Sequence, residues 1–335
     1  MTNESNIKLT SAELSQIWTS YQNDTASICI LKYFLNIVED PDISALLERA
    51  LHLSQTHIEK LTDIFNEENY PIPVGFSENK ELNIEAPRLF SDQYLLHFMY
   101  QMSEISLNAY SVAKSLAVRS DIDTYFSGCL TEAGELNTMA KQILLSKGLF
   151  VRSPFIPYPE KADFVQKQSF LTGWFGERRP LLSLEITNLF ANFQRNALGS
   201  ATLVGFSQVT QNKKIGKFFV RGKEIADKHN EIFGSILSED DLPVPMTSGS
   251  FATKSNVPPF SDKLMLYIVT SLIGLSIGYY GTSISTSVRR DLTLHYDRII
   301  HEILKYSEDG ANLLIDHGWM EEPPRASDRD ELANK

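Results

Sequence analysis

A long internal repeat constrains the fold more than any other feature of this chain. The segment ELSQIWTSYQ at 13–22 aligns with EITNLFANFQ at 185–194, at an offset of 172 residues. Beyond a loop that differs in length by two residues, the offset becomes 170, and FSD at 90–92 aligns with FSD at 260–262. Matches that keep one offset over long stretches indicate a tandem duplication. The two halves are therefore expected to share one fold.

Each half contains four long stretches in which apolar residues recur at helical spacing. The connection between the second and third stretches is long in each half, whereas the other two are short. A bundle with one long crossover has the ferritin-like topology. The sequence therefore predicts an all-α protein with two tandem ferritin-like four-helix bundles related by internal duplication. The expected helices cover residues 11–39, 42–68, 92–119 and 120–148, and then 184–210, 212–237, 262–289 and 291–316.

The expected domain boundaries follow from the repeat and from the composition between its copies. They are a first bundle at 1–151, a linker at 152–180, a second bundle at 181–324 and a polar tail at 325–335. The linker is rich in proline, glycine and aromatic residues, whereas a flexible linker would be polar. We therefore expect an ordered strap that lies on one or both bundles. Its expected anchors are Phe155, Phe164, Phe170, Trp174 and Phe175.

The most apolar stretch, residues 263–288, carries no charge after its first residue and is long enough to cross a bilayer. Its counterpart in the first half, 93–118, contains a glutamate and a lysine, and a charge near the bilayer centre is costly. Two copies of one fold should use the segment alike. We therefore expect no membrane insertion, and a helix buried by its neighbours on nearly all sides. Gly274, Gly278 and Gly281 are expected to let another helix pack closely.

The charge balance and the cysteines indicate the compartment. The net charge is -11, which disfavours nucleic acid and anionic lipid surfaces as partners. The N-terminal residues lack the basic and apolar regions of a secretory signal. Cys29 and Cys129 lie in apolar helical patterns, so we expect buried, reduced thiols. The predicted location is the cytoplasm.

A di-iron site in a ferritin-like bundle requires a Glu-x-x-His motif on each of two helices. None of the 7 histidines has a glutamate three residues before it, so this motif is not present. One polar feature remains in each half. His57 and His229 lie on the apolar stripe of the second helix, and Glu132 and Glu302 flank the stripe of the fourth.

The histidine and the glutamate of a half need not meet at all, and if they do meet, two interpretations stay open. In the first, each is a core histidine with one hydrogen bond and a glutamate at the rim, and no cofactor is bound. In the second, His57 with Glu132 and His229 with Glu302 form an atypical site for iron, manganese or copper. Tyr110 and Tyr280, or Gln22 and Gln194, could complete that site.

Other polar motifs favour structure over chemistry. Arg119 with Asp121, and Arg289 with Asp291, fall at the turn between the third and fourth helices of each half, where a structural role explains them. The sequence alone suggests no Ser/His/Asp or Cys/His set.

Several segments carry a resemblance to a known family. They are APRLFSDQYLLHFM, FLTGWFGERRPL, RGKEIADKHNEIF, YYGTSISTSVRRDL and EDGANLLIDHGWMEEPP. They resemble a family of paired ferritin-like bundles, of unknown function, from Bacillus and its spore-forming relatives. That family is distantly similar to the spore coat F protein. The resemblance covers nearly the whole chain and implies the fold and a sporulation or stress setting, but no particular reaction.

The predicted function is a non-enzymatic structural or protein-interaction role, linked to sporulation, the spore coat or stress. It rests on a bundle that keeps its fold without the usual ligands for chemistry. Protein partners or self-association would follow. Two alternatives stay open: a metal-dependent oxidoreductase with an atypical site in the bundle core, and a protein that binds an apolar small ligand along the glycine-rich helix of the second half.

Overall fold

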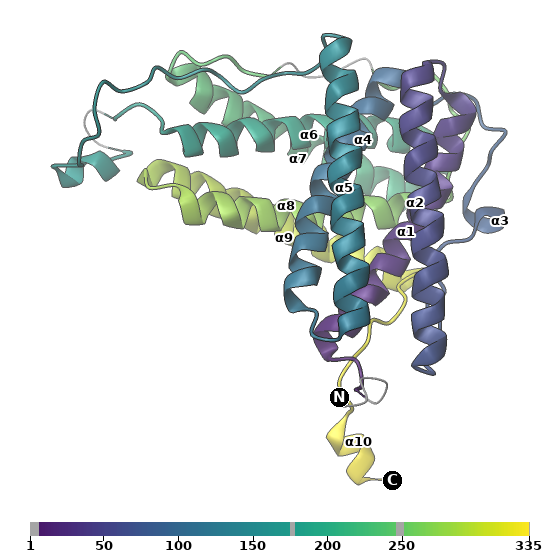
Figure 1. The fold of residues 1–335 in the computed structure, drawn as a ribbon. Helices are drawn as coiled ribbons and strands as arrows, with labels where there is room; N and C mark the ends of the chain where they lie inside the picture. The colour runs from purple at the N-terminus through teal and green to yellow at the C-terminus, as the bar shows by residue number, and fades with distance from the viewer. Residues whose placement is uncertain (1–6, 175–177, 246–250, 335) are drawn as a thin grey trace. The chain divides into compact units, whose positions relative to one another are not determined.

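The structure is a computed structural model, which describes residues 7–174, 178–245 and 251–334. These residues are almost entirely helical and contain no β-strand (Figure 1). The long helices of the first half are α1 (Ser11–Ile37), α2 (Pro41–Glu67), α4 (Asp92–Leu116) and α5 (Ser120–Ser146). Those of the second half are α6 (Ser183–Val209), α7 (Lys213–Glu239), α8 (Asp262–Thr286) and α9 (Arg290–Asp316). Short helical turns occur at α3 (Glu78–Glu81), η2 (Gln168–Leu171) and α10 (Arg329–Ala333).

The predicted all-α fold with a duplicated set of four long helices is confirmed. The helices end where local chemistry stops them. Asp40 accepts hydrogen bonds from the first turn of α2, and Pro41 occupies its first position. Gly148 and Gly318, just after α5 and α9, adopt φ values of 67° and 66°, which glycine tolerates best.

The chain divides into two compact units. The first comprises residues 1–85, 95–146 and 318–335, and the second comprises 86–94 and 147–317. Each unit therefore includes a short segment from the other half of the sequence, which the predicted boundaries at 151 and 181 do not anticipate. In the second unit, the ring of Phe90 lies so close to Gly205 that a Cβ there would come within 2.4 Å of it.

The first bundle packs all four of its long helices around one core. Ile17 of α1, Leu61 and Phe65 of α2, Ala113 of α4, and Phe126 of α5 are buried together there. In the second bundle, α6 packs against α7 and α8, and α9 packs against the same two helices, which closes a ring of four. Both cores are mainly apolar, and each contains a buried histidine on its second helix, His57 or His229.

Helix α8 is less enclosed than the sequence suggested. It is long and apolar enough to cross a membrane by length and composition, and 39% of its most apolar window is buried. The expectation that neighbours bury it on nearly all sides is therefore wrong. A Cβ at Gly274, Gly278 or Gly281 would meet nothing within 4 Å, so these glycines do not seat another helix. The reason is geometric: a helix in a bundle contacts its neighbours along one side, and the glycines fall on the other.

The linker also differs in part from the expected strap. Phe155 and Phe164 are 76% and 86% exposed, so they do not anchor it. Phe170 does pack, because the guanidinium of Arg179 lies 4.4 Å from its ring centroid. Phe175 lies outside the described residues.

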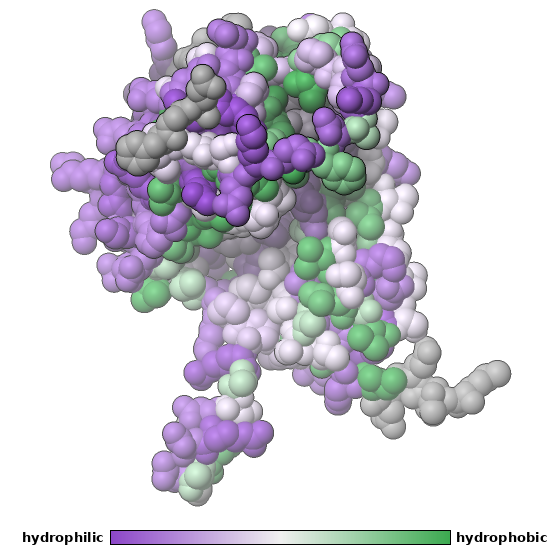
Figure 2. Space-filling view, turned by 90° about the vertical axis from the view of Figure 1, so that its left-hand side faces the viewer, coloured by the Kyte–Doolittle hydropathy of each residue, from purple (hydrophilic) through white to green (hydrophobic). Residues whose placement is uncertain are grey.

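Figure 2 shows hydrophobic residues exposed among hydrophilic ones on one face of the molecule.

Candidate functional site

The structure brings His57 and Glu132 together at the centre of the first bundle. His57 lies on the apolar side of α2, between buried Leu53 and Leu61, and is itself 5% exposed. Its Nε2 atom lies 2.8 Å from a carboxylate oxygen of Glu132 on α5. The side chain of Glu132 is 26% exposed, so it lies at the rim of the core. The structure therefore brings together two residues whose meeting the sequence left open.

Two further residues complete this cluster, and the sequence analysis missed both. Asp24 of α1 is 6% exposed, and its Oδ2 atom lies 3.5 Å from Nδ1 of His57. The Sγ atom of Cys129 on α5 lies 3.5 Å from Nε2 of His57. The statement that no Cys/His set exists was therefore wrong. The sequence signal that could have revealed this cluster is Asp24 itself, a charged residue at a core position of the first helix.

Two tyrosines enclose the imidazole of His57. The rings of Tyr110 on α4 and Tyr125 on α5 meet it edge-on, with centroid distances of 6.1 and 5.9 Å. All four long helices of the bundle therefore contribute to the cluster. The Oδ2 atom of Asp24, the Nδ1 atom of His57 and the hydroxyl of Tyr125 are buried without a hydrogen-bond partner. The first two of these atoms face each other at 3.5 Å, an ion-pair distance. Buried polar atoms without a hydrogen bond call for an explanation, such as a bound water or ion or a catalytic role.

The electrostatics of His57 and Asp24 are coupled. Burial disfavours the imidazolium, but contacts with Asp24 and with Cys129 outweigh it and raise the pKa of His57 from 6.5 to about 11. Burial also raises the pKa of the Asp24 carboxyl, against the effect of His57 and Ser54. The two groups therefore titrate as a pair and not independently.

The second bundle has a related but different centre. The Nε2 atom of His229 on α7 lies 3.2 Å from a carboxylate oxygen of Glu302 on α9. Its Nδ1 atom lies 3.1 Å from the hydroxyl of Tyr280, which accepts a 2.7 Å hydrogen bond from the amide of Asn196. The partner of Nδ1 is therefore a neutral hydroxyl group. The partner of Nε2, Glu302, is shared, because the ammonium group of Lys228 donates a 2.8 Å hydrogen bond to the same carboxylate.

A comparison of the two copies shows which groups changed. At the repeat offset, Asp24 corresponds to Asn196 and Cys129 corresponds to Ile299. Burial lowers the pKa of His229 below 6.5, and Glu302 opposes this only in part. The first centre thus favours a charged histidine among acidic groups, and the second favours a neutral one.

The residues expected to complete a site behave differently from one another. Tyr280 bonds to His229, whereas Tyr110 contacts His57 only through its ring. Gln22 donates a 2.6 Å hydrogen bond to Glu321, whose carboxylate also accepts from the backbone N–H groups of Val74 and Gly75. Gln194 makes a weak 3.5 Å contact with a backbone carbonyl. Neither glutamine joins a histidine centre.

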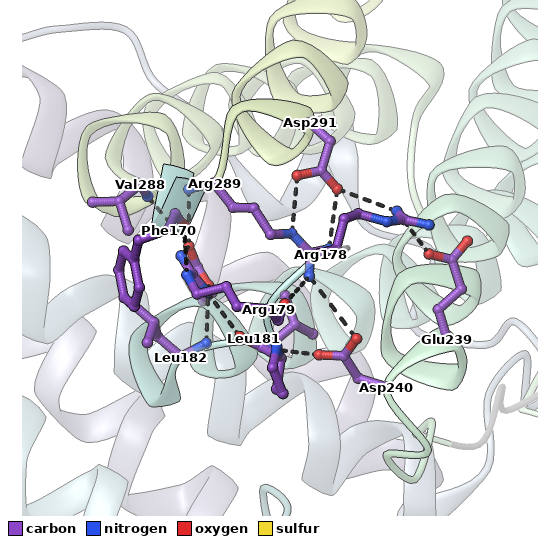
Figure 3. A network of polar contacts seen from close by, with 12 residues as sticks. Phe170, Arg178, Arg179, Leu181, Leu182, Glu239, Asp240, Val288, Arg289 and Asp291 are labelled. Carbon is purple, nitrogen blue, oxygen red and sulfur yellow. Dashed lines mark hydrogen bonds and ion pairs between the residues drawn. The ribbon is translucent and has the colours of Figure 1, made fainter. Parts of the chain in front are cut away.

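A second polar cluster is the ionic network at the start of α6 (Figure 3). Arg289 is 1% exposed and binds Asp291 through two hydrogen bonds of 2.9 and 3.0 Å. Arg179 likewise donates two hydrogen bonds, of 2.8 and 2.9 Å, to the fully buried carboxylate of Glu185. The other oxygen contacts of Glu185 come from the backbone N–H groups of Leu182, Val288 and Arg289. The network joins the start of α6 to the turn between α8 and α9.

The first bundle repeats most of this network, with Ile7 at the position of Arg179. Glu13 accepts hydrogen bonds from the backbone N–H groups of Val118 and Arg119, at 2.9 and 2.8 Å. Arg119 binds Asp121 through two 2.8 Å hydrogen bonds and also pairs with Glu68. The structural role predicted for both Arg–Asp pairs matches this geometry, because each pair holds helix ends together.

A groove of about 680 Å³ lies in the second unit between α6, α7 and the segment that follows α7. Phe193, Ala197, Lys223 and Asp227 are among the residues that line it. The residues that line this groove do not include the glycines of α8, the helix along which the sequence allows an apolar small ligand to bind.

Comparisons with known proteins identify the family. A family model described as protein of unknown function (DUF3231) matches residues 1–162 and again residues 169–332. The search of curated proteins gave no match. Among solved structures, the chain is similar to a candidate spore coat protein from Bacillus halodurans, at 16% identity and a TM-score of 0.43. That similarity covers 45% of this chain and 98% of the other. The two matched repeats agree with the internal duplication, and the chain belongs to the DUF3231 family of proteins of unknown function.

Proposed function

We propose that the protein has a non-enzymatic structural or protein-interaction role. The supporting observation is that the two copies share the network of hydrogen bonds and ion pairs at the helix ends, around Glu13 and Glu185, but differ at their core centres. Most of the network at the helix ends is retained, because Glu13 and Glu185 each accept hydrogen bonds from two backbone N–H groups at the turn after the third long helix. Arg119 and Arg289 each bind the aspartate two residues further on. At the core centres, the histidine, the glutamate and a tyrosine (Tyr110 or Tyr280) are common to both copies, whereas Asp24 and Cys129 are not.

The shared network is suited to a structural role. A buried carboxylate that accepts several backbone hydrogen bonds fixes the helix ends from which those N–H groups point. Removing one partner of such a buried ion pair leaves the charge of the other uncompensated. The network therefore favours the one arrangement of helices in which all its partners meet. A repeated catalytic centre would instead be expected to keep the same reactive groups in both copies.

The linker offers the surface for a protein partner. Phe155, Tyr158 and Phe164 are 76%, 86% and 86% exposed, within one short non-helical segment. Aromatic side chains are favoured in protein interfaces because they bury much apolar area. The proposal includes the ferritin-like assignment of the bundles and a cytoplasmic or spore-associated setting, as the family resemblance suggests.

Fractionation of the organism that encodes the chain tests this function. We expect the tagged protein to enter a large assembly during growth or sporulation. The double variant Phe155→Ser/Phe164→Ser should be released as a smaller species, whereas Val118→Ser, at an 82% exposed position of the first bundle, should behave like wild type. A wild-type protein that stays monomeric under all conditions, or equal behaviour of all three proteins, would contradict the proposal.

A further inference from the structure

We propose that the first bundle binds one zinc-class divalent metal ion through Nε2 of His57, Sγ of Cys129 and the carboxylate of Glu132, and that the second bundle does not. This site is separate from the structural role proposed above. The three ligand atoms lie within 4.8 Å of one another. Cys129 and Glu132 are three residues apart on α5, so they project from one side of that helix toward α2.

The distance between the imidazole nitrogen and the thiol sulfur matches tetrahedral coordination. Bonds of about 2.0 Å to nitrogen and about 2.3 Å to sulfur place the two ligand atoms about 3.5 Å apart around a tetrahedral ion. The Nε2–Sγ separation in the structure is 3.5 Å. The Nε2–Oε2 separation is 2.8 Å, a hydrogen-bond distance, and it would widen to about 3.3 Å around an ion. Glu132 can make this small movement because its side chain lies at the partly exposed rim.

Asp24 supplies the support that metal-bound histidines usually have. A histidine that binds a metal through one nitrogen commonly donates the N–H of the other to a carboxylate. The Oδ2 atom of Asp24 faces Nδ1 of His57 at 3.5 Å, and both atoms are buried without a hydrogen-bond partner. An ion on Nε2 fixes the proton on Nδ1 and directs it at this oxygen. The arrangement therefore gives these two atoms the hydrogen bond that they lack in the structure.

The ligand set selects the class of metal. A thiolate with an imidazole and one carboxylate suits zinc, or cobalt as its spectroscopic substitute, better than magnesium or calcium, which prefer oxygen ligands. The thiolate and the carboxylate together balance the charge of a divalent ion, while Asp24 lies outside the coordination sphere. Three protein ligands leave one position open, as in zinc sites that bind water or a small ligand.

The second bundle serves as an internal comparison within the same chain. Ile299 stands where Cys129 would supply sulfur, and Asn196 stands in place of Asp24. Lys228 holds Glu302 at 2.8 Å and brings a positive charge to the place where an ion would sit. Each of these differences disfavours a cation at His229.

The proposal is tested with the full-length chain, purified without chelators and then titrated with Co²⁺ and with Zn²⁺. We expect one ion per chain by elemental analysis and a near-ultraviolet thiolate-to-cobalt charge-transfer band. Cys129→Ser should abolish the band and weaken Zn²⁺ binding at least about 100-fold, and Asp24→Asn should weaken it about 10- to 100-fold. The matched controls Cys29→Ser, at another buried thiol of the same bundle, and His229→Ala should keep both the band and the stoichiometry.

Circular dichroism and thermal unfolding of each variant show whether it folds, and Cys129→Ser changes one atom only. Failure to obtain a stoichiometric ion with either metal would overturn the proposal. Persistence of the charge-transfer band in Cys129→Ser, or its loss in Cys29→Ser, would also overturn it. In either of those last two cases the sulfur ligand would not be Cys129.

Discussion

The buried carboxylate of Glu13 should contribute strongly to the stability of the first bundle. It is 2% exposed and accepts hydrogen bonds from the backbone N–H groups of Thr10, Val118 and Arg119. Glu13→Gln keeps one oxygen acceptor, but it points an NH₂ group at N–H donors. The substitution therefore removes the charge and leaves donors facing each other inside the protein.

The size of the effect follows from the pKa of this carboxyl. Burial alone would raise it, but the backbone hydrogen bonds outweigh burial and lower the pKa from 4.5 to about 2. A lowering of this size corresponds to about 3 kcal/mol of folding free energy at neutral pH. Because the folded-state pKa is depressed, this contribution is complete above pH 4.5 and is lost as the pH falls toward 2.

Urea unfolding at several pH values measures this contribution. Trp18 packs against the core of the first bundle, so its fluorescence reports on that bundle in a Trp174→Phe/Trp319→Phe background. Glu13→Gln should lose about 3 kcal/mol at pH 7, and the difference from wild type should shrink between pH 4.5 and 2.

The matched control is Glu135→Gln, which removes a 3.2 Å ion pair with Arg49 at an exposed position. Such pairs contribute about 0–1 kcal/mol, so this variant should stay close to wild type. Equal stability of the two variants at pH 7, or a difference for Glu13→Gln that is unchanged at pH 2, would refute the reasoning.

Further predictions concern the second bundle. Gly222→Ala should destabilise it by about 1–3 kcal/mol in thermal unfolding, because the new Cβ would lie 2.0 Å from the hydroxyl of Tyr306. Gly274→Ala, in open space on α8, should instead stabilise it by about 0.5–1 kcal/mol, and the opposite order would contradict the described packing. Long-range ¹H–¹⁵N spectra should show His229 neutral at pH 6.5, since burial lowers its pKa. In Lys228→Met that pKa should rise, because a neighbouring positive charge is removed; no change would show that Lys228 does not act on the ring.

Much of the fold follows from local sequence signals. The repeat offsets and the helical spacing locate every long helix to within a few residues, because amphipathic patterns and chain-breaking residues act locally. The exposure of Gly274, Gly278 and Gly281 could not be obtained in this way. An apolar helix with glycines has the same composition whether its small residues face a neighbour or solvent.

The candidate site was predictable only in part. His57 and Glu132 were found because each lies on or beside a stripe whose direction helical periodicity fixes. Asp24 and Cys129 were missed because an aspartate and a cysteine within apolar helical patterns carry no local sign of their partner. Only tertiary packing brings each of them within 3.5 Å of His57. The exposed Phe155 and Phe164 illustrate the same limit, since aromatic composition indicates apolar surface but not what covers it.

The exchange of short segments between the two units has a practical consequence for dissecting this protein. A cut between the repeats would deprive the second fragment of Phe90, whose ring fills the space beside Gly205. It would also deprive the first fragment of Glu321, the acceptor for Gln22 and for two backbone N–H groups. Fragments are therefore best designed by co-expression of the two halves, or by grafting the missing segment onto each piece.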